Sequence, residues 1–313
     1  MRCCRFLFIL TCFLGCERQQ LASKPAASTP APAVVSVTPL RPSIAEVVAP
    51  APSQPQRLEA KVNLPPGLAA GQKVPLLLML HSLGTSADDI ESRTDWTTFA
   101  ERNGIAWLAP NGPVDAQGRR FWDAGPSCCN FGGSPLDHVA ALRALLEESL
   151  ASNPIDRERV FVGGISNGGF MAHRLACAAP ELVRGVVSIS GAGPLETVRC
   201  KEPSSLRVLE VHGDADPIVG YEGGHLFKSA QMPEHASAEK TVRDWAERLG
   251  CRSDPVQGQP LNLETRYPGQ ETRVARYDGC TRGNVELWTV AGGDHYLAFR
   301  NPAPDAIWQF LSR

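Results

Sequence analysis

The sequence has no excess of basic residues. Its 313 residues include 31 Lys and Arg against 33 Asp and Glu, which gives a formal net charge of -2. Proteins that bind a nucleic-acid backbone present a basic face that neutralises the phosphates. The charge balance therefore argues against a nucleic-acid partner.

Clustered metal ligands are also missing. The chain has ten cysteines, but no C-x-x-C pair with a histidine partner occurs, and among the six cysteines beyond residue 56 the one close spacing is the adjacent Cys128-Cys129. Structural zinc sites are built from such pairs. We therefore expect no metal site.

The N-terminal apolar run is too short to cross a bilayer. Two arginines precede residues 6–14, and this charge and length are typical of a signal peptide. The run ends at Gly15-Cys16, which resembles a bacterial lipobox, in which the cysteine is acylated. We predict a lipoprotein-type signal peptide over residues 1–16 and an exported protein whose membrane contact is a lipid anchor on Cys16, at the outer membrane or cell surface. The alternative is a plain signal peptide and a secreted or periplasmic protein.

Residues 17–56 are dominated by Ala, Pro, Ser and Thr. Such a composition cannot bury a core and is typical of an extended, disordered spacer. The folded domain is therefore expected over residues 57–313, a length that can bury a full-sized core.

Six of the ten cysteines lie beyond residue 56. An even number in an exported protein indicates disulfides, and six cysteines allow fifteen pairings. We favour Cys177–Cys200 and Cys251–Cys280, and leave Cys128 and Cys129 undecided.

Apolar runs alternate with helical patterns through the predicted domain. Helices are expected over 135–150, with Ser134 as N-cap and Pro135 at the first helical position, and over 237–249, closed by Gly250. This alternation predicts the α/β fold class, with a mostly parallel central sheet, helices on both faces and ligands at the carboxyl ends of the strands. The runs that we expect to form strands are 76–80, 106–109, 160–162, 186–189, 206–211 and 285–290.

The passage Gly164-Ile165-Ser166-Asn167-Gly168 lies between a predicted strand and a helix expected over 168–179. A G-x-S-x-G turn in this context is the nucleophile elbow of the α/β-hydrolase fold, which exposes a serine at a helix N-terminus. Glycines let the backbone turn sharply there, and the helix amides favour developing negative charge. The alternative is an ordinary Gly/Ser loop.

A nucleophilic serine needs a histidine to take its proton and a carboxylate to hold that histidine's tautomer. In this fold they follow in the order serine, acid, histidine. His295, just after the last predicted strand, is our candidate base, with a structural histidine as the alternative. Asp216 is our candidate acid, while Asp214 is expected to cap its turn and His212 to orient the same loop by hydrogen bonding.

Backbone amides must stabilise the oxyanion of a tetrahedral intermediate. The Asn167 amide, directly after the serine, is one candidate, and the Leu83 amide, in the loop after the first predicted strand, is the other. A simple turn at residues 81–84 is the alternative reading.

With these residues in place, nearly all of the predicted domain resembles the carbohydrate esterase family that joins feruloyl and acetylxylan esterases to poly(3-hydroxybutyrate) depolymerases and LpqC-type exported lipoproteins. The resemblance implies hydrolysis of carboxylic esters by Ser166, Asp216 and His295, without a metal or organic cofactor. It is carried by Leu80-His81-Ser82-Leu83-Gly84, residues 122–129, residues 154–162 with Ser166-Asn167-Gly168-Gly169, residues 214–219 with Tyr221-Glu222-Gly223-Gly224, and Gly292-Gly293-Asp294-His295.

Two positions depart from the pattern of the family. Ser82 stands where a glycine is usual in the oxyanion loop, so a residue with a Cβ must adopt the backbone angles of that position. Residues 293–299 also differ from the usual G-G-G-H-T-W-P, which affects the loop that borders the substrate pocket. Four aromatic residues could stack on an acyl group or sugar, although packing is the alternative: Phe121, Trp122, Tyr221 and Tyr296.

We therefore expect an exported serine esterase that forms an acyl-enzyme, with feruloyl or acetyl sugar esters or hydroxyalkanoate oligomers as substrates. A peptidase or thioesterase with the same three residues is an alternative, because pocket shape sets the leaving group. A non-catalytic glycan-binding lipoprotein is a further alternative. The oligomeric state stays open.

Overall fold

A computed structural model describes residues 57–94, 96–299 and 302–313. The predicted signal peptide, the predicted acylation site Cys16 and the predicted spacer over 17–56 lie outside these residues. None of the helices in the described part combines the length and the apolar character needed to span a membrane.

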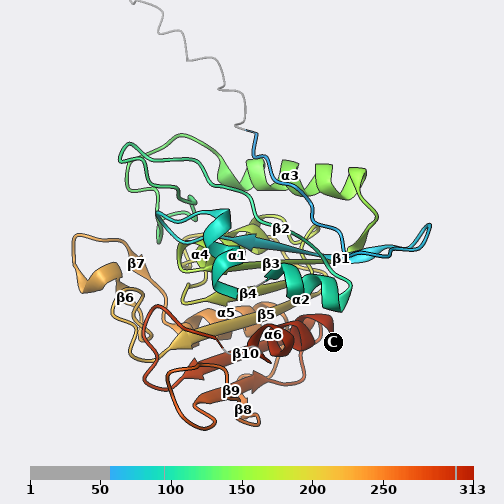
Figure 1. Cartoon of the computed structure of the whole chain (residues 1–313). Helices are drawn as coiled ribbons and strands as arrows, with labels where there is room; N and C mark the ends of the chain where they lie inside the picture. The colour runs from blue at the N-terminus through green and yellow to red at the C-terminus, as the bar shows by residue number, and fades with distance from the viewer. Residues whose placement is uncertain (1–56, 95, 300–301) are drawn as a thin grey trace, which may run out of the picture. The chain divides into compact units, whose positions relative to one another are not determined.

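An eight-stranded sheet runs through the described residues in the order β2-β1-β3-β4-β5-β10-β9-β8 (Figure 1). The first six strands in this order, ending with β10, pair in parallel with their neighbours within this group. The strand β9 pairs antiparallel with both β10 and β8. The six predicted strands are all present, and the mostly parallel sheet is confirmed. The strands are β1 (Val74–Leu80), β2 (Ala106–Leu108), β3 (Ile155–Ile165), β4 (Gly185–Ile189), β5 (Leu206–Gly213), β8 (Val256–Gln257), β9 (Thr272–Tyr277) and β10 (Gly283–Val290).

Helices cover both faces of this sheet, as predicted (Figure 1). On one face lie α3 (His138–Ser152), α4 (Asn167–Ala178) and α5 (Ala238–Arg248). On the other lie α1 (Ala87–Thr94), α2 (Trp96–Asn103) and α6 (Pro302–Ser312). All seven residues of β1 are buried, because a central parallel strand has helices against both of its sides. A short hairpin, β6 (Gly224–His225) and β7 (Glu234–His235), flanks the 3₁₀ helix η1 (Leu226–Lys228).

The predicted start of α3 is wrong by three residues. Its N-cap is Asp137, whose carboxylate accepts a hydrogen bond of 2.9 Å from the Ala140 amide. Ser134 lies in the preceding loop. Its amide donates a hydrogen bond to the side-chain oxygen of Asn130, and its carbonyl accepts one from the side-chain nitrogen of Asn130. Asp137 is the N-cap because its side chain accepts a hydrogen bond from a helix amide that would otherwise be unpaired.

The predicted helix over 237–249 is α5. Ser237 caps it by accepting a hydrogen bond from the Lys240 amide. Gly250, with a φ of +66°, follows its end. A left-handed glycine is the usual residue there, so this helix is bounded as its sequence predicts.

Three disulfides occur in the described residues. One joins Cys177 at the end of α4 to Cys200, and another joins Cys251 after α5 to Cys280 before β10. The structure thus brings together both pairs that the sequence favoured. Cys128 and Cys129, which the sequence left undecided, form a vicinal pair.

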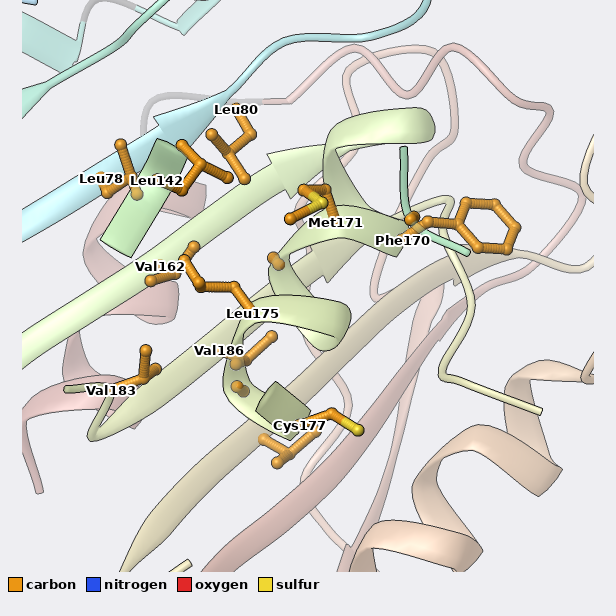
Figure 2. Close-up of a cluster of buried hydrophobic side chains, with 14 of the residues drawn as sticks. Leu78, Leu80, Leu142, Val162, Phe170, Met171, Leu175, Cys177, Val183 and Val186 are labelled. Atoms are coloured by element: carbon orange, nitrogen blue, oxygen red, sulfur yellow. The ribbon is translucent and has the colours of Figure 1, made fainter. Parts of the chain in front are cut away.

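The helix α4 packs its apolar side chains onto the middle of the sheet. Figure 2 shows Met171 and Leu175 of α4 in one cluster with Val162 of β3 and Val186 of β4. Leu175 is fully buried in this cluster. Because α4 begins at the residue after Ser166, this packing fixes the position of the elbow relative to the sheet.

We expect Leu175→Ala to lower the free energy of unfolding by about 3 kcal/mol, because it leaves a cavity under α4. Urea unfolding of the purified domain measures this change. Leu64→Ala is the matched control: Leu64 is 39% exposed, so its truncation should cost less than about 1 kcal/mol. Equal losses for the two variants would contradict the packing described above.

Candidate active site

Ser166 occupies the turn between β3 and α4 in a strained backbone conformation. Its φ is 54° and its ψ is -118°, a combination that residues with a Cβ rarely adopt. The Ser166 amide donates a hydrogen bond of 2.7 Å to the Ile189 carbonyl at the end of β4. The strain therefore persists because the neighbouring strand holds the turn, and it is typical of a functional residue.

The two glycines of the motif serve close approach of backbone segments. A Cβ on Gly164 would overlap the backbone of Gly168, and a Cβ on Gly168 would overlap the Leu80 carbonyl at the end of β1. Neither glycine has a positive φ. The sharp turn that the sequence assigned to the glycines is therefore made by Ser166 itself. The glycines instead let the start of α4 pack closely against β3 and β1.

The structure brings Ser166, His295 and Asp216 together at the carboxyl ends of their strands. His295 Nε2 lies 2.9 Å from Ser166 Oγ, and His295 Nδ1 lies 2.7 Å from Asp216 Oδ2. The second oxygen, Asp216 Oδ1, accepts the amides of Ile218 and Val219. A serine, an imidazole and a carboxylate thus form one continuous chain of hydrogen bonds.

Asp216 is ionised in this arrangement. Burial raises the pKa of its carboxyl, but hydrogen bonds from His212 and His295 outweigh burial and hold the pKa below its usual range. Asp214, the alternative acid, faces elsewhere: it accepts the Gly292 amide at 2.7 Å and pairs with Arg273 at 3.0 Å. Asp214 therefore braces the loop that carries His295 without touching His295.

Arg266 holds the same loop from its other side. Its guanidinium bonds the carboxylates of Asp294 and Glu264 and the carbonyl of Tyr296. These bonds raise the pKa of Arg266 and lower that of Asp294. The residues on both sides of His295 are thus fixed by one side chain. No sequence motif surrounds Arg266, so this role is not predictable from the sequence.

The two amides predicted to stabilise an oxyanion belong to Leu83, in the loop after β1, and to Asn167, directly after Ser166. Leu83 lines the same pocket as Ser166, and Asn167 is the first residue of α4. Ser82 does not have a positive φ, so its Cβ causes no left-handed strain. Its hydroxyl donates to the Ile165 carbonyl at 3.2 Å, which ties the loop after β1 to the residue before Ser166.

Two buried side chains fix the walls around these amides. The Asn167 side chain bonds both the amide and the carbonyl of Trp122, at 2.7 and 2.8 Å. His81 Nε2 accepts the Gly112 amide at 2.9 Å, and burial lowers the pKa of His81 to about 4. His81 is therefore neutral near pH 7 and acts as a hydrogen-bonding brace.

An apolar pocket of about 320 Å³ opens over Ser166 and His295. The Cys128–Cys129 disulfide forms part of its wall. Among the described residues, no lysine or arginine lines it. Three of its aromatic lining residues are more than a third exposed, Phe131, Phe227 and Tyr296.

Of the aromatic residues considered for stacking, Tyr296 alone lines this pocket. Phe121, Trp122 and Tyr221 are buried and pack in the interior. Within the described ranges, no group of three or more His, Cys, Asp or Glu side chains could hold a metal ion.

Comparison with known proteins points to esterases. A family model described as Phospholipase/Carboxylesterase matches residues 136–244. A probable feruloyl esterase C from Aspergillus terreus is 30% identical over 259 residues, covering 80% of this chain and 82% of its own length. Feruloyl esterase B from Piromyces equi is 26% identical over 254 residues, and the match covers 80% of this chain but 44% of that relative. The chain thus spans about half the length of the second relative.

The solved acetyl xylan esterase from Aspergillus awamori is similar in fold. It aligns with a TM-score of 0.56 at 15% identity, covering 82% of this chain and 94% of its own. An identity this low supports the likeness of the fold alone.

We expect Arg266→Ala to reduce kcat for a short-chain p-nitrophenyl ester by about tenfold, because a loosened His295 loop misplaces the imidazole. Arg276→Ala is the control, since Arg276 makes a comparable exposed ion pair with Asp278 at 2.8 Å on β9. If kcat were equal in Arg266→Ala, Arg276→Ala and the unmodified protein, the proposed role of Arg266 in holding the His295 loop would be refuted.

Proposed function

Because the chain belongs to the α/β-hydrolase family of carboxylic ester hydrolases that includes the feruloyl esterases, we propose that it is a serine esterase that works through an acyl-enzyme at Ser166. The observation that carries this proposal is the continuous chain of hydrogen bonds from Ser166 through His295 to Asp216. Its two links, 2.9 and 2.7 Å, lie within the range for direct proton transfer and orientation.

The proposed reaction begins when Ser166 Oγ attacks the ester carbonyl and His295 Nε2 takes the hydroxyl proton. Asp216 accepts from His295 Nδ1, which leaves Nε2 free to act as a base. The same histidine then protonates the departing alcohol. A water molecule, deprotonated by His295, releases the acyl group from Ser166.

The negative charge of the tetrahedral intermediate needs donors that are already in place. We assign this role to the Asn167 amide at the N-terminus of α4 and to the Leu83 amide. Supporting this, neither amide donates a hydrogen bond to another described residue. The Ser82 hydroxyl supports the assignment by fixing the Leu83 loop to the elbow.

The pocket favours an uncharged ester with an apolar acyl group. Its side chains are mostly aliphatic and aromatic, and among the described residues the side chains of its lining that can carry a charge near neutral pH are Asp89 and His295. Feruloyl or acetyl sugar esters and hydroxyalkanoate oligomers fit this chemistry. A panel of these esters, with a peptide and a thioester beside them, separates the esterase from a peptidase or thioesterase.

Export and lipid anchoring through Cys16 belong to the same proposal. They rest on the sequence of residues 1–16 and on the spacer composition of residues 17–56. The Cys177–Cys200 and Cys251–Cys280 disulfides support them, since such bonds persist in oxidising compartments.

Ser166→Ala tests the nucleophile. We expect hydrolysis of p-nitrophenyl acetate and methyl ferulate by residues 57–313 to fall by about a thousandfold or more, because the variant cannot form the acyl-enzyme. Ser253→Ala, at an exposed serine that does not line this pocket, is the control and should retain full activity. Equal rates for Ser166→Ala and the unmodified protein would exclude Ser166 as nucleophile and would leave the glycan-binding alternative standing.

Phe227→Ala tests the pocket rim. Phe227 is 49% exposed, and a hydrogen bond from its amide to the Ile218 carbonyl holds it there at 2.8 Å. We expect KM for methyl ferulate to rise about fivefold, since an aromatic contact contributes about 1 kcal/mol, while KM for p-nitrophenyl acetate stays constant. Val256→Ala, an exposed apolar residue on β8, should change neither value. Unchanged KM for methyl ferulate in Phe227→Ala would contradict this role.

A further inference from the structure

A chain of buried ionisable groups continues from Asp216 into the interior. His212 Nε2 lies 3.4 Å from Asp216 Oδ2, and His212 Nδ1 lies 3.1 Å from Glu210 Oε1. The other oxygen, Glu210 Oε2, lies 3.0 Å from His173 Nε2 on α4. The side chains of His212, Glu210 and His173 are 0–1% exposed.

The hydrogen-bond partners show where the protons lie. The Trp245 indole can only donate, so His173 Nδ1 accepts from it at 3.1 Å and His173 Nε2 donates to Glu210. His212 Nε2 faces the Val219 carbonyl at 2.8 Å, which can only accept. Its Nδ1 faces the carboxylate of Glu210. With Glu210 ionised, both ring nitrogens of His212 face acceptors, which favours the imidazolium form of the ring.

The electrostatics agree with this assignment. Burial lowers the pKa of His212, but hydrogen bonds to Asp216 and Glu210 outweigh it and raise the pKa to about 9. Burial raises the pKa of Glu210, yet hydrogen bonds from His173 and His212 hold it below its ordinary value. The interior thus contains an anion, a cation and an anion in a row: Glu210, His212 and Asp216.

Apolar side chains would fill these positions on β5 at a lower cost. Taking charges out of water is expensive, and a buried ion pair seldom stabilises a fold more than a well-packed apolar pair. Neighbouring β5 residues Val208 and Leu209 are apolar and fully buried. A charged pair placed directly behind the acid of the site is therefore a candidate for function.

We propose that His212 is a positioning residue that holds Asp216 as a carboxylate and, through Asp216, sets the pH at which His295 becomes a base, while Glu210 keeps His212 charged. This rests on the proposed serine-esterase function. A cation beside Asp216 offsets part of the negative potential that otherwise favours protonated His295.

Two further polar side chains lie near His212, Tyr221 and His235, and the Nε2 atom of His235 has no hydrogen-bond partner among the described residues. The Tyr221 ring packs edge-on against His212, at 6.0 Å between centroids, and the Tyr221 hydroxyl bonds Thr289 on β10. His235 on β7 bonds the Ala236 carbonyl, and burial lowers its pKa. The remaining charged partners are Glu210 and Asp216, so they are the groups to vary.

The test compares His212→Gln and Glu210→Gln/His212→Gln with the unmodified protein. Glutamine retains a donor for Val219 and removes the charge. We expect the acid limb of the kcat/KM profile to move to higher pH by about one unit in His212→Gln, as removal of a nearby unit charge requires. The double variant, which leaves no unpaired buried carboxylate at residue 210, should shift in the same direction by less. An acid limb that coincides with that of the unmodified protein in a folded double variant would overturn the proposal.

His225→Gln/Glu234→Gln is the matched control. His225 and Glu234 form a second histidine–glutamate pair, at 3.4 Å, which does not contact Asp216. The acid limb of the kcat/KM profile of this control variant should coincide with that of the unmodified protein. A shift equal to that of His212→Gln would also overturn the proposal.

Two NMR measurements need no turnover, so they separate failure of this inference from failure of the proposed function. In the unmodified protein near neutral pH, both ¹⁵N resonances of His212 should report protonated nitrogens, and a neutral tautomer would overturn the proposal. The imidazole titration of His295 should move to higher pH in the double variant. Absence of esterase activity, with these NMR results intact, would refute the proposed function alone.

Discussion

The strained backbone of Ser166 is the constraint on which the rest of the site depends. A left-handed serine is stable here because the Ile189 carbonyl binds its amide and α4 packs onto the sheet directly after it. Both glycines of the motif are required by this packing, since a Cβ on either would overlap backbone. The buried face of α4 therefore holds the serine hydroxyl in place against its own conformational preference.

The order of strands then assembles the remaining groups. Ser166 follows β3, Asp216 follows β5 and His295 follows β10, and β4 alone lies between β3 and β5 in the sheet. Parallel strands end at the same edge, so residues 129 positions apart in sequence meet within 2.9 Å. Arg266 and Asp214 add specific bonds that fix the last of these loops.

The sequence alone predicts much of this arrangement. The parallel sheet follows from uninterrupted apolar runs, and Ser166, His295 and Asp216 follow from a motif and from their places after predicted strands. The strands β8 and β9 were missed, because β9 contains Arg273 and Arg276 at exposed positions and lacks an apolar run. Arg266, the Asn167–Trp122 clamp and Glu210 could not be found either, since each acts through a contact between distant segments. His212 was expected to orient its loop, but its charge becomes evident only once Glu210 and Asp216 lie on either side of it.

The central claim is that the acyl group passes through Ser166 Oγ. Mass spectrometry of the protein treated with a p-nitrophenyl organophosphate, followed by peptide mapping, tests this most directly. We expect one adduct, on the peptide that contains Ser166, with loss of esterase activity in proportion to labelling. An adduct at another residue, or complete inhibition with Ser166 unmodified, would contradict the proposed mechanism.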